Sequence, residues 1–152
     1  MKGAKGVNDL IRYLFIFAFD HDIGVLLIST CEEYNSLADK TKKTIIINTN
    51  WKKQNELPFI IGHEIGHIMN GDTNNDIEYY CGSPITSVER KADLYSLNLI
   101  YKYASSQFET FDEPGIFMEQ FGIPYRMKGD VYKLFKENDD LVFWSQWKRY
   151  NI

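Results

Sequence analysis

Two histidines and a glutamate stand together in the motif His63-Glu64-x-x-His67. If this stretch is helical, residues four apart lie one turn apart on the same face, so the two imidazoles point at one spot. Two neutral imidazoles that converge in this way form half of a zinc site. Glu64 is turned about 100° away from His63, so it can take a proton from metal-bound water without ligating the metal. The alternative is that the three residues only decorate the surface of a helix.

The residues around the motif predict that it is helical. Apolar side chains recur there at helical spacing, at Ile60, Ile61, Ile65, Ile68 and Met69. Asn55 can cap the start of the helix, and Pro58 comes early enough to be tolerated. Asn70-Gly71 is a stop signal. The sequence therefore predicts a helix from about Glu56 to Asn70.

A second set of candidate residues falls on a helix predicted over residues 88–104. One face of this helix carries two acids on a partly apolar stripe: Glu89, Ala92, Asp93, Ser96 and Ile100. Buried carboxylates are costly unless they are paired or bind a metal. If this face packs on the histidine helix, Glu89 completes a zinc site that leaves one position open for water. Asp93, one turn further, can then accept an N–H from a ligating imidazole.

The same helix allows a second interpretation. Small Ala92 would let the two helices approach closely, as the metal site requires. Glu89 can instead belong to a salt-bridged surface helix, with Lys91 and Lys102 nearby.

The remaining elements are expected to form the scaffold of the protein. Further helices are predicted over residues 7–20, 112–121 and 124–138, and strands over residues 24–30 and 44–48. Residues 35–43, which include the basic cluster Lys40, Lys42 and Lys43, are predicted to be a loop. Residues 78–82 are expected to form a short strand or an extended segment.

Length and composition restrict the class of protein. The 152 residues, 44% hydrophobic and 25% charged, suit a single globular domain, with a core over about residues 7–138 and an aromatic tail over residues 139–152. The net charge of −4 gives no global basic field for nucleic acid. The apolar run around Arg12 is too short to span a bilayer, and two cysteines make no disulfide framework. We expect a soluble cytoplasmic protein that binds neither nucleic acid nor a membrane.

Taken together, three stretches resemble the ImmA/IrrE-type zinc metallopeptidases, gluzincin-like proteins of bacteria, prophages and mobile elements. These stretches are Ile45-Ile46-Ile47-Asn48, His63-Glu64-Ile65-Gly66-His67 and Glu89-x-x-Ala92-Asp93. The resemblance covers roughly residues 24–100, with weaker similarity in residues 117–124. It implies an α+β, zincin-like fold in which a small three-stranded sheet packs on a helical bundle. It also implies that zinc is bound by His63, His67 and Glu89 and that Glu64 is the general base. Asp93 is then an acid that does not ligate the metal but supports a ligating histidine.

The resemblance further implies a function and a partner. Family members of known role resemble regulated proteases that cleave a helix-turn-helix repressor, and others occur beside toxin–antitoxin regulators. This chain has no basic DNA-reading module, so a repressor would have to be a separate protein. Candidates for stabilising the oxyanion are Tyr79, Tyr80, Arg90 and Tyr95.

A rival hypothesis from another class is a non-catalytic, metal-stabilised interaction protein that sequesters a transcriptional regulator. A fourth protein ligand would support it, because a closed coordination sphere makes zinc structural. The sequence offers three residues for this position, namely His21, Asp72 and Cys81.

Overall fold

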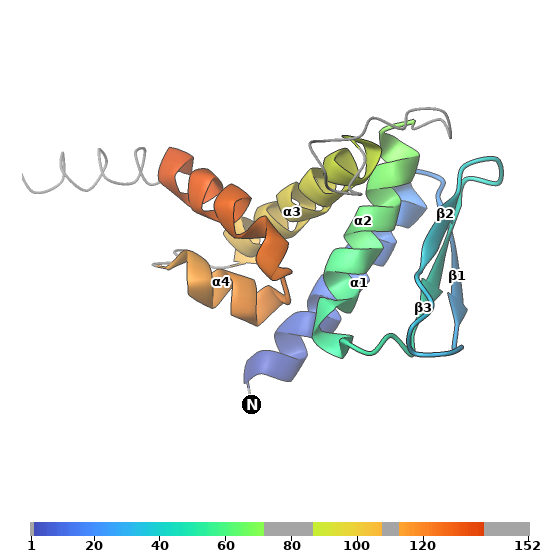
Figure 1. The fold of residues 1–152 in the computed structure, drawn as a ribbon, viewed down its shortest axis with the longest axis horizontal. Coiled ribbons are helices and arrows are strands. Elements are labelled where there is room, and N and C mark those ends of the chain that lie inside the picture. The colour runs from blue at the N-terminus through green and yellow to red at the C-terminus, as the bar shows by residue number, and fades with distance from the viewer. Residues whose placement is uncertain (1, 72–86, 108–112, 139–152) are drawn as a thin grey trace, which may run out of the picture.

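The computed structural model describes residues 2–71, 87–107 and 113–138, and it shows a mixed α+β protein, which confirms the predicted fold class. Figure 1 shows a helical layer beside a small sheet. The elements in chain order are α1 (Lys2–Asp20), β1 (Gly24–Ile28), β2 (Leu37–Asp39), β3 (Thr44–Asn48), α2 (Leu57–Met69), α3 (Ser87–Gln107) and α4 (Pro114–Phe121). Short 3₁₀ turns occupy Gln54–Glu56 and Tyr125–Met127, and a further helix covers residues 128–138.

The sheet has the strand order β1-β3-β2, with β1 parallel and β2 antiparallel to the central strand β3. Ile45 and Ile47 of β3 are buried, because they face the helices. Both predicted strands are present, and β3 has the predicted bounds. The prediction of a loop over residues 35–43 was wrong in part, because β2 lies inside it. Its three residues show no strand pattern of their own and are extended because they pair with β3.

The helix α2 carries the motif and differs little from its predicted range. The predicted stop is present, since Asn70 ends the helix and Gly71 has a φ of 63°, which suits glycine. The predicted cap was wrong. Asn55 lies inside the preceding 3₁₀ turn, and Glu56 is the residue before α2, without a side-chain cap. Helix α1 begins at Lys2, earlier than predicted.

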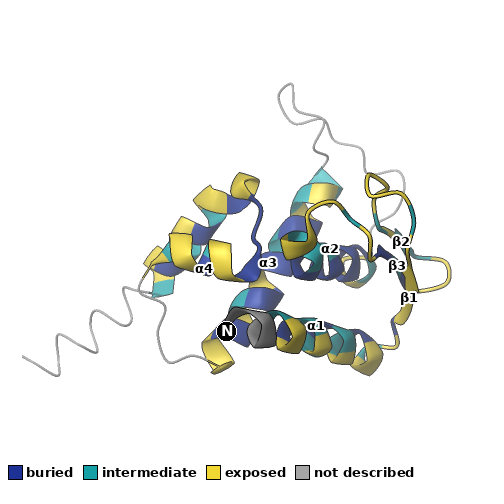
Figure 2. Cartoon of the chain, turned by 90° about the horizontal axis from the view of Figure 1, so that it is seen from below, coloured by how far each residue is buried: buried dark blue, intermediate teal, exposed yellow. Residues whose placement is uncertain are grey.

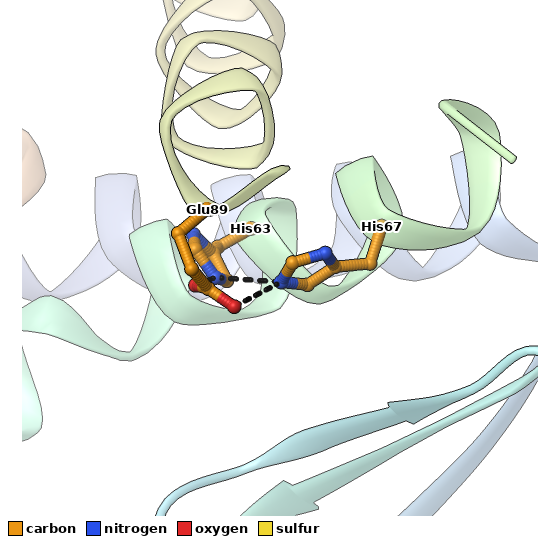
Figure 3. A group of neighbouring side chains, drawn as sticks. All are labelled: His63, His67 and Glu89. Carbon is orange, nitrogen blue, oxygen red and sulfur yellow. Dashed lines mark hydrogen bonds and ion pairs between the residues drawn. The ribbon is translucent and has the colours of Figure 1, made fainter. Parts of the chain in front are cut away.

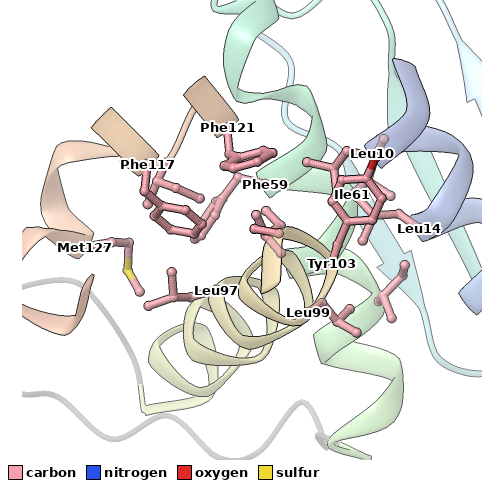
Figure 4. Packing of buried hydrophobic residues seen from close by; sticks show 14 of the residues in the cluster. Leu10, Leu14, Phe59, Ile61, Leu97, Leu99, Tyr103, Phe117, Phe121 and Met127 are labelled. Atoms are coloured by element: carbon pink, nitrogen blue, oxygen red, sulfur yellow. The ribbon is translucent and has the colours of Figure 1, made fainter. Parts of the chain in front are cut away.

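The core lies among the helices and extends to the inner face of the sheet (Figure 4). Each helix contributes side chains to it, and examples are Leu10, Leu14, Phe59, Ile61, Leu97, Tyr103, Phe117 and Phe121. Figure 2 shows the buried residues on the facing sides of the helices, with exposed residues on the outer sides. This packing fixes α2 between α1, α3 and the sheet.

Helices α2 and α3 approach each other closely. A Cβ at Gly62 would lie 2.3 Å from the Ser96 hydroxyl, and one at Gly66 would lie 3.0 Å from the Ala92 carbonyl oxygen. The Ser96 hydroxyl donates to the Phe59 carbonyl across the same contact, at 2.7 Å. The small residues therefore let two backbones meet, as predicted from Ala92.

The C-terminal elements are attached to the start of α2. Helix α4 has its predicted end, where Gly122 adopts a φ of 64°. A Cβ at Gly122 would lie 1.7 Å from the Asn55 carbonyl oxygen, so only glycine fits. The helix predicted over residues 124–138 is present from residue 128, after the 3₁₀ turn.

The aromatic tail, residues 139–152, and the segment 78–82 lie outside the described residues, and the single-domain organisation stays a prediction. Within the described ranges, no helix is both long and apolar enough to cross a membrane.

We expect Gly66→Ala to lower the free energy of unfolding of the metal-free protein by up to about 2 kcal/mol, measured by urea denaturation. Overpacking against the α3 backbone costs about 1–3 kcal/mol, and the gain in helix propensity offsets about 1 kcal/mol of this. Gly129→Ala is the control, because a Cβ there would meet no atom within 4 Å. The control should be neutral or stabilising, and equal effects of both changes would contradict the close contact.

Candidate metal centre

Three side chains with metal-ligating atoms lie close together between α2 and the start of α3. They are His63 and His67 of α2 and Glu89 of the first turn of α3, and their ligand atoms all lie within 4.8 Å of one another. Figure 3 shows the two imidazoles and the carboxylate pointing toward a common centre. The structure thus brings together the three residues that the sequence singled out as ligands.

The donor atoms and their separations suit a metal ion. The two Nε2 atoms are 3.0 Å apart, and Glu89 carboxylate oxygens lie 2.8 Å from His63 Nε2 and 3.2 Å from His67 Nε2. Ligands at about 2.0–2.1 Å from a tetrahedral zinc ion lie about 3.3 Å from each other. Two imidazole nitrogens and a carboxylate oxygen are also the donor set of many catalytic zinc sites. The residues therefore fit a zinc-like ion.

Asp93 orients one of the imidazoles. Its Oδ1 lies 2.8 Å from His63 Nδ1, and the ionised carboxylate can only accept, so Nδ1 carries the proton of this bond. When the ring is neutral, the lone pair of Nε2 therefore points toward His67 and Glu89. This is the position that the sequence predicted for Asp93.

Arg126 holds Asp93 from the other side, and sequence reasoning missed it. Its Nε donates to Asp93 Oδ2 at 2.9 Å and its Nη2 donates to Oδ1 at 3.0 Å. Its guanidinium also lies 5.5 Å from the centre of the Phe59 ring. Arg126 follows Pro124 in the 3₁₀ turn, 33 residues from Asp93, and no spacing rule connects such distant positions. A basic residue just after the weaker stretch of family resemblance was the only available signal.

Glu64 lies beside the ligand group without belonging to it. Only 7% of its surface is exposed, and it lines the same cleft as the two histidines. Burial raises the pKa of Glu64, and the neighbouring imidazoles oppose this effect. A carboxylate with a raised pKa is a better proton acceptor near neutral pH. The geometry therefore leaves Glu64 available for proton transfer.

In the metal-free protein, hydrogen bonds among the imidazoles and carboxylates of the site shift their pKa values. Burial disfavours the charged form of His63, but hydrogen bonds to Asp93 and Glu89 outweigh it and raise its pKa to about 9. The pKa of His67 is also raised, because its bond to Glu89 outweighs burial. Hydrogen bonds from both imidazoles hold the pKa of Glu89 below its usual range. At neutral pH a metal ion must therefore displace a proton from His63.

Other sequence candidates are placed elsewhere. His21 Nδ1 lies 2.8 Å from the Phe17 carbonyl oxygen, and its ring stacks on Phe17, so it is not in the ligand group. Arg90 forms a bidentate ion pair with Asp130. Tyr95 packs against the core, with its ring edge toward Phe17. Neither Arg90 nor Tyr95 lines the cleft.

Four further candidates lie outside the described residues. They are the possible ligands Asp72 and Cys81 and the possible oxyanion donors Tyr79 and Tyr80. Their predicted roles stay predictions.

The ligand group opens into a cleft of about 580 Å³ between α2 and the edge strand β2. Residues of β2 and the segment before it form one wall, and α2 forms the other. Trp51 and Arg126 also line it. The Trp51 Nε1–H is buried and has no hydrogen-bond partner among the described residues. The cleft has room for several residues of an extended peptide.

Comparisons with known proteins gave one match. The family model described as peptidase family M48 matches residues 34–112, just over half of the chain. The matched segment runs from the loop before β2 past α3, so it contains both histidines, Glu64 and Glu89. No curated protein and no solved structure matched the chain.

We expect metal affinity to rise about tenfold per pH unit up to about pH 9, because binding displaces the proton of His63. The raised pKa of His63 also contributes stability to the metal-free fold, which is fully present below about pH 6.5 and is lost as pH rises through about 9. Competition with a chromophoric chelator between pH 7 and 9 measures the affinity. His21→Gln, outside the ligand group, should keep the slope, and a pH-independent affinity of the wild type would refute the shared proton.

We expect Asp93→Asn to weaken metal binding by about 10- to 100-fold, because His63 loses the carboxylate that orients its ring. The same chelator competition measures this loss. Asp130→Asn is the matched control, since it removes the partner of Arg90 without touching a histidine. Equal affinities of the two variants would show that Asp93 does not support the site.

Proposed function

The chain belongs to peptidase family M48, a family of metal-dependent peptidases, and from this premise we propose that it is a zinc-dependent endopeptidase. The observation that carries the proposal is the convergence of His63, His67 and Glu89 beside Glu64 in an open cleft. A zinc ion held by these three residues would lower the pKa of water and polarise a peptide carbonyl.

Glu64 supplies proton transfer in the proposed reaction. Its carboxylate accepts a proton from the water whose oxygen attacks the carbonyl carbon. Glu64 then donates this proton to the amine nitrogen as the C–N bond breaks, so the carboxylate returns to its starting state. The burial of Glu64 excludes bulk water from this transfer.

The ligands are held in place by their neighbours. Asp93 fixes the tautomer of His63, and Arg126 balances the charge of Asp93. These contacts keep Nε2 of His63 directed at the metal position, which is the orientation that binding requires.

The shape of the cleft favours cleavage within a chain. The strand β2 is an edge strand, and Leu37 and Ala38 line the cleft. An extended peptide can add to such an edge through main-chain hydrogen bonds. A peptide bound in this way passes in front of the ligand group and continues beyond it on both sides.

We also propose a substrate, on the resemblance to the ImmA/IrrE-type proteins. On this resemblance, the proposed substrate is a separately encoded helix-turn-helix repressor, cleaved in a phage, mobile-element or toxin–antitoxin context. Cleavage would require a flexible segment of the repressor to enter the cleft in an extended form.

One observation favours the rival function, a metal-stabilised protein that sequesters a regulator. Of the oxyanion candidates within the described residues, Arg90 is paired with Asp130 and Tyr95 packs against the core, partly buried. A metal site that lacks an oxyanion donor would bind a partner without efficient cleavage.

We expect Glu64→Gln to retain one equivalent of zinc and to lose cleavage by at least about 100-fold, because the amide cannot accept the proton of water. His63→Ala should lose both zinc and cleavage. Mass spectrometry gives the metal content, and a pool of synthetic peptides assayed for new termini gives the activity.

The control for this experiment is Glu137→Gln, an exposed carboxylate on the helix over residues 128–138. It should match the wild type in both measurements. Cleavage retained by Glu64→Gln would disprove its role as base. Zinc bound by the wild type without cleavage of any peptide or repressor would favour the sequestering protein.

A further inference from the structure

Three lysines crowd the tight turn between β2 and β3. Lys40 lines the cleft, and Lys42 and Lys43 are exposed beside it. The turn is closed by the Lys43 N–H, which donates to the Lys40 carbonyl oxygen at 3.3 Å. This positive cluster stands on a chain whose net charge is −4.

No ion pair neutralises these lysines within the described ranges of the chain. The nearest acid in sequence is Asp39, whose Oδ1 accepts the Lys42 backbone N–H at 3.1 Å. The opposite end of the cleft differs, because Glu56 and Arg126 there carry opposite charges. The cleft is therefore electrostatically asymmetric along its length.

The fold determines which end of a bound peptide meets the lysines. Strand β3 leads from the turn toward the start of α2, so the turn lies level with the end of α2 (Figure 1). Strand β2 runs toward the turn. A peptide paired with β2 in the more favourable antiparallel sense runs away from the turn. Its amino-terminal part therefore lies beside the lysines, and its carboxyl-terminal part points toward Trp51 and Arg126.

We propose that Lys40 and Lys42 select peptides with acidic side chains on the amino-terminal side of the scissile bond. The inference rests on the proposed peptidase function and names the substrate class that this cleft prefers. Unpaired ammonium groups at the mouth of a cleft attract carboxylates and also raise the rate of encounter. Lys43 contributes to the same field from outside the cleft.

The test uses the zinc-loaded full-length chain and a pool of synthetic peptides with randomised sequences. Sequencing the products by mass spectrometry gives residue preferences on each side of the cleaved bond. We expect Asp and Glu to be enriched before the bond in wild-type products. Two peptides that differ only there, Asp-Glu against Asn-Gln, should differ about fivefold in kcat/KM at low salt, the size of one exposed ion pair, and less at 1 M salt.

The variant Lys40→Glu/Lys42→Glu should abolish or invert the preference, with the circular dichroism spectrum unchanged. Lys43, which already adopts a positive φ of 50° in the turn, is left unchanged so that the backbone of the turn is not altered. Lys136→Glu, on the helix over residues 128–138, makes a similar charge change outside the cleft and should keep the preference.

The outcomes separate the two proposals. Cleavage by the wild type without an acidic preference, or with the same preference in the double variant, would overturn the inference and leave the peptidase function intact. Failure of the zinc-loaded wild type to cleave any peptide would overturn the peptidase function, and the inference would fall with it.

Discussion

The candidate metal centre depends on the contact between α2 and α3, where two glycines of α2 face α3 without side chains. Two of the candidate ligands come from α2 and the third from α3, so the distance between the helix axes decides whether all three reach one point. Gly62 and Gly66 allow Ser96 and Ala92 to approach as closely as a backbone permits. Metal–ligand bonds tolerate errors of only about 0.2 Å, so this packing has to be held tightly. Gly66, inside the motif, therefore serves the fold and the site together.

Buried charge around the site is balanced pair by pair. Asp93 is almost fully buried and would be costly alone, yet it binds an imidazole on one side and a guanidinium on the other. Burial by itself raises the pKa of Asp93, but these two partners outweigh it and hold the pKa below its usual range. The network thus keeps a negative charge next to His63, which favours a ring that donates from Nδ1 and offers Nε2 to a cation.

Much of this arrangement could be read from the sequence, because the relevant rules are local. The i, i+4 spacing of His63 and His67 and the stop at Asn70-Gly71 depend on one helix only. The pairing of Glu89 with these histidines needed one further assumption, that two amphipathic faces pack together. The three residues of β2 could not be recognised, since their extended form comes from pairing with β3. Arg126 could not be assigned either, because its role depends on where the chain returns after α4.

The Asp93–Arg126 bond joins the metal centre to the C-terminal elements, and this has a thermodynamic consequence. Arg126 belongs to the 3₁₀ turn between α4 and the last described helix, and Gly122 anchors that region to the Asn55 carbonyl. If docking of this region raises the affinity of the site for a cation through His63, then cation binding must raise the equilibrium constant for docking by the same factor. The ion and the C-terminal helices thus stabilise each other's binding to the rest of the protein. The occupancy of the cation site should therefore report on how firmly these helices are docked.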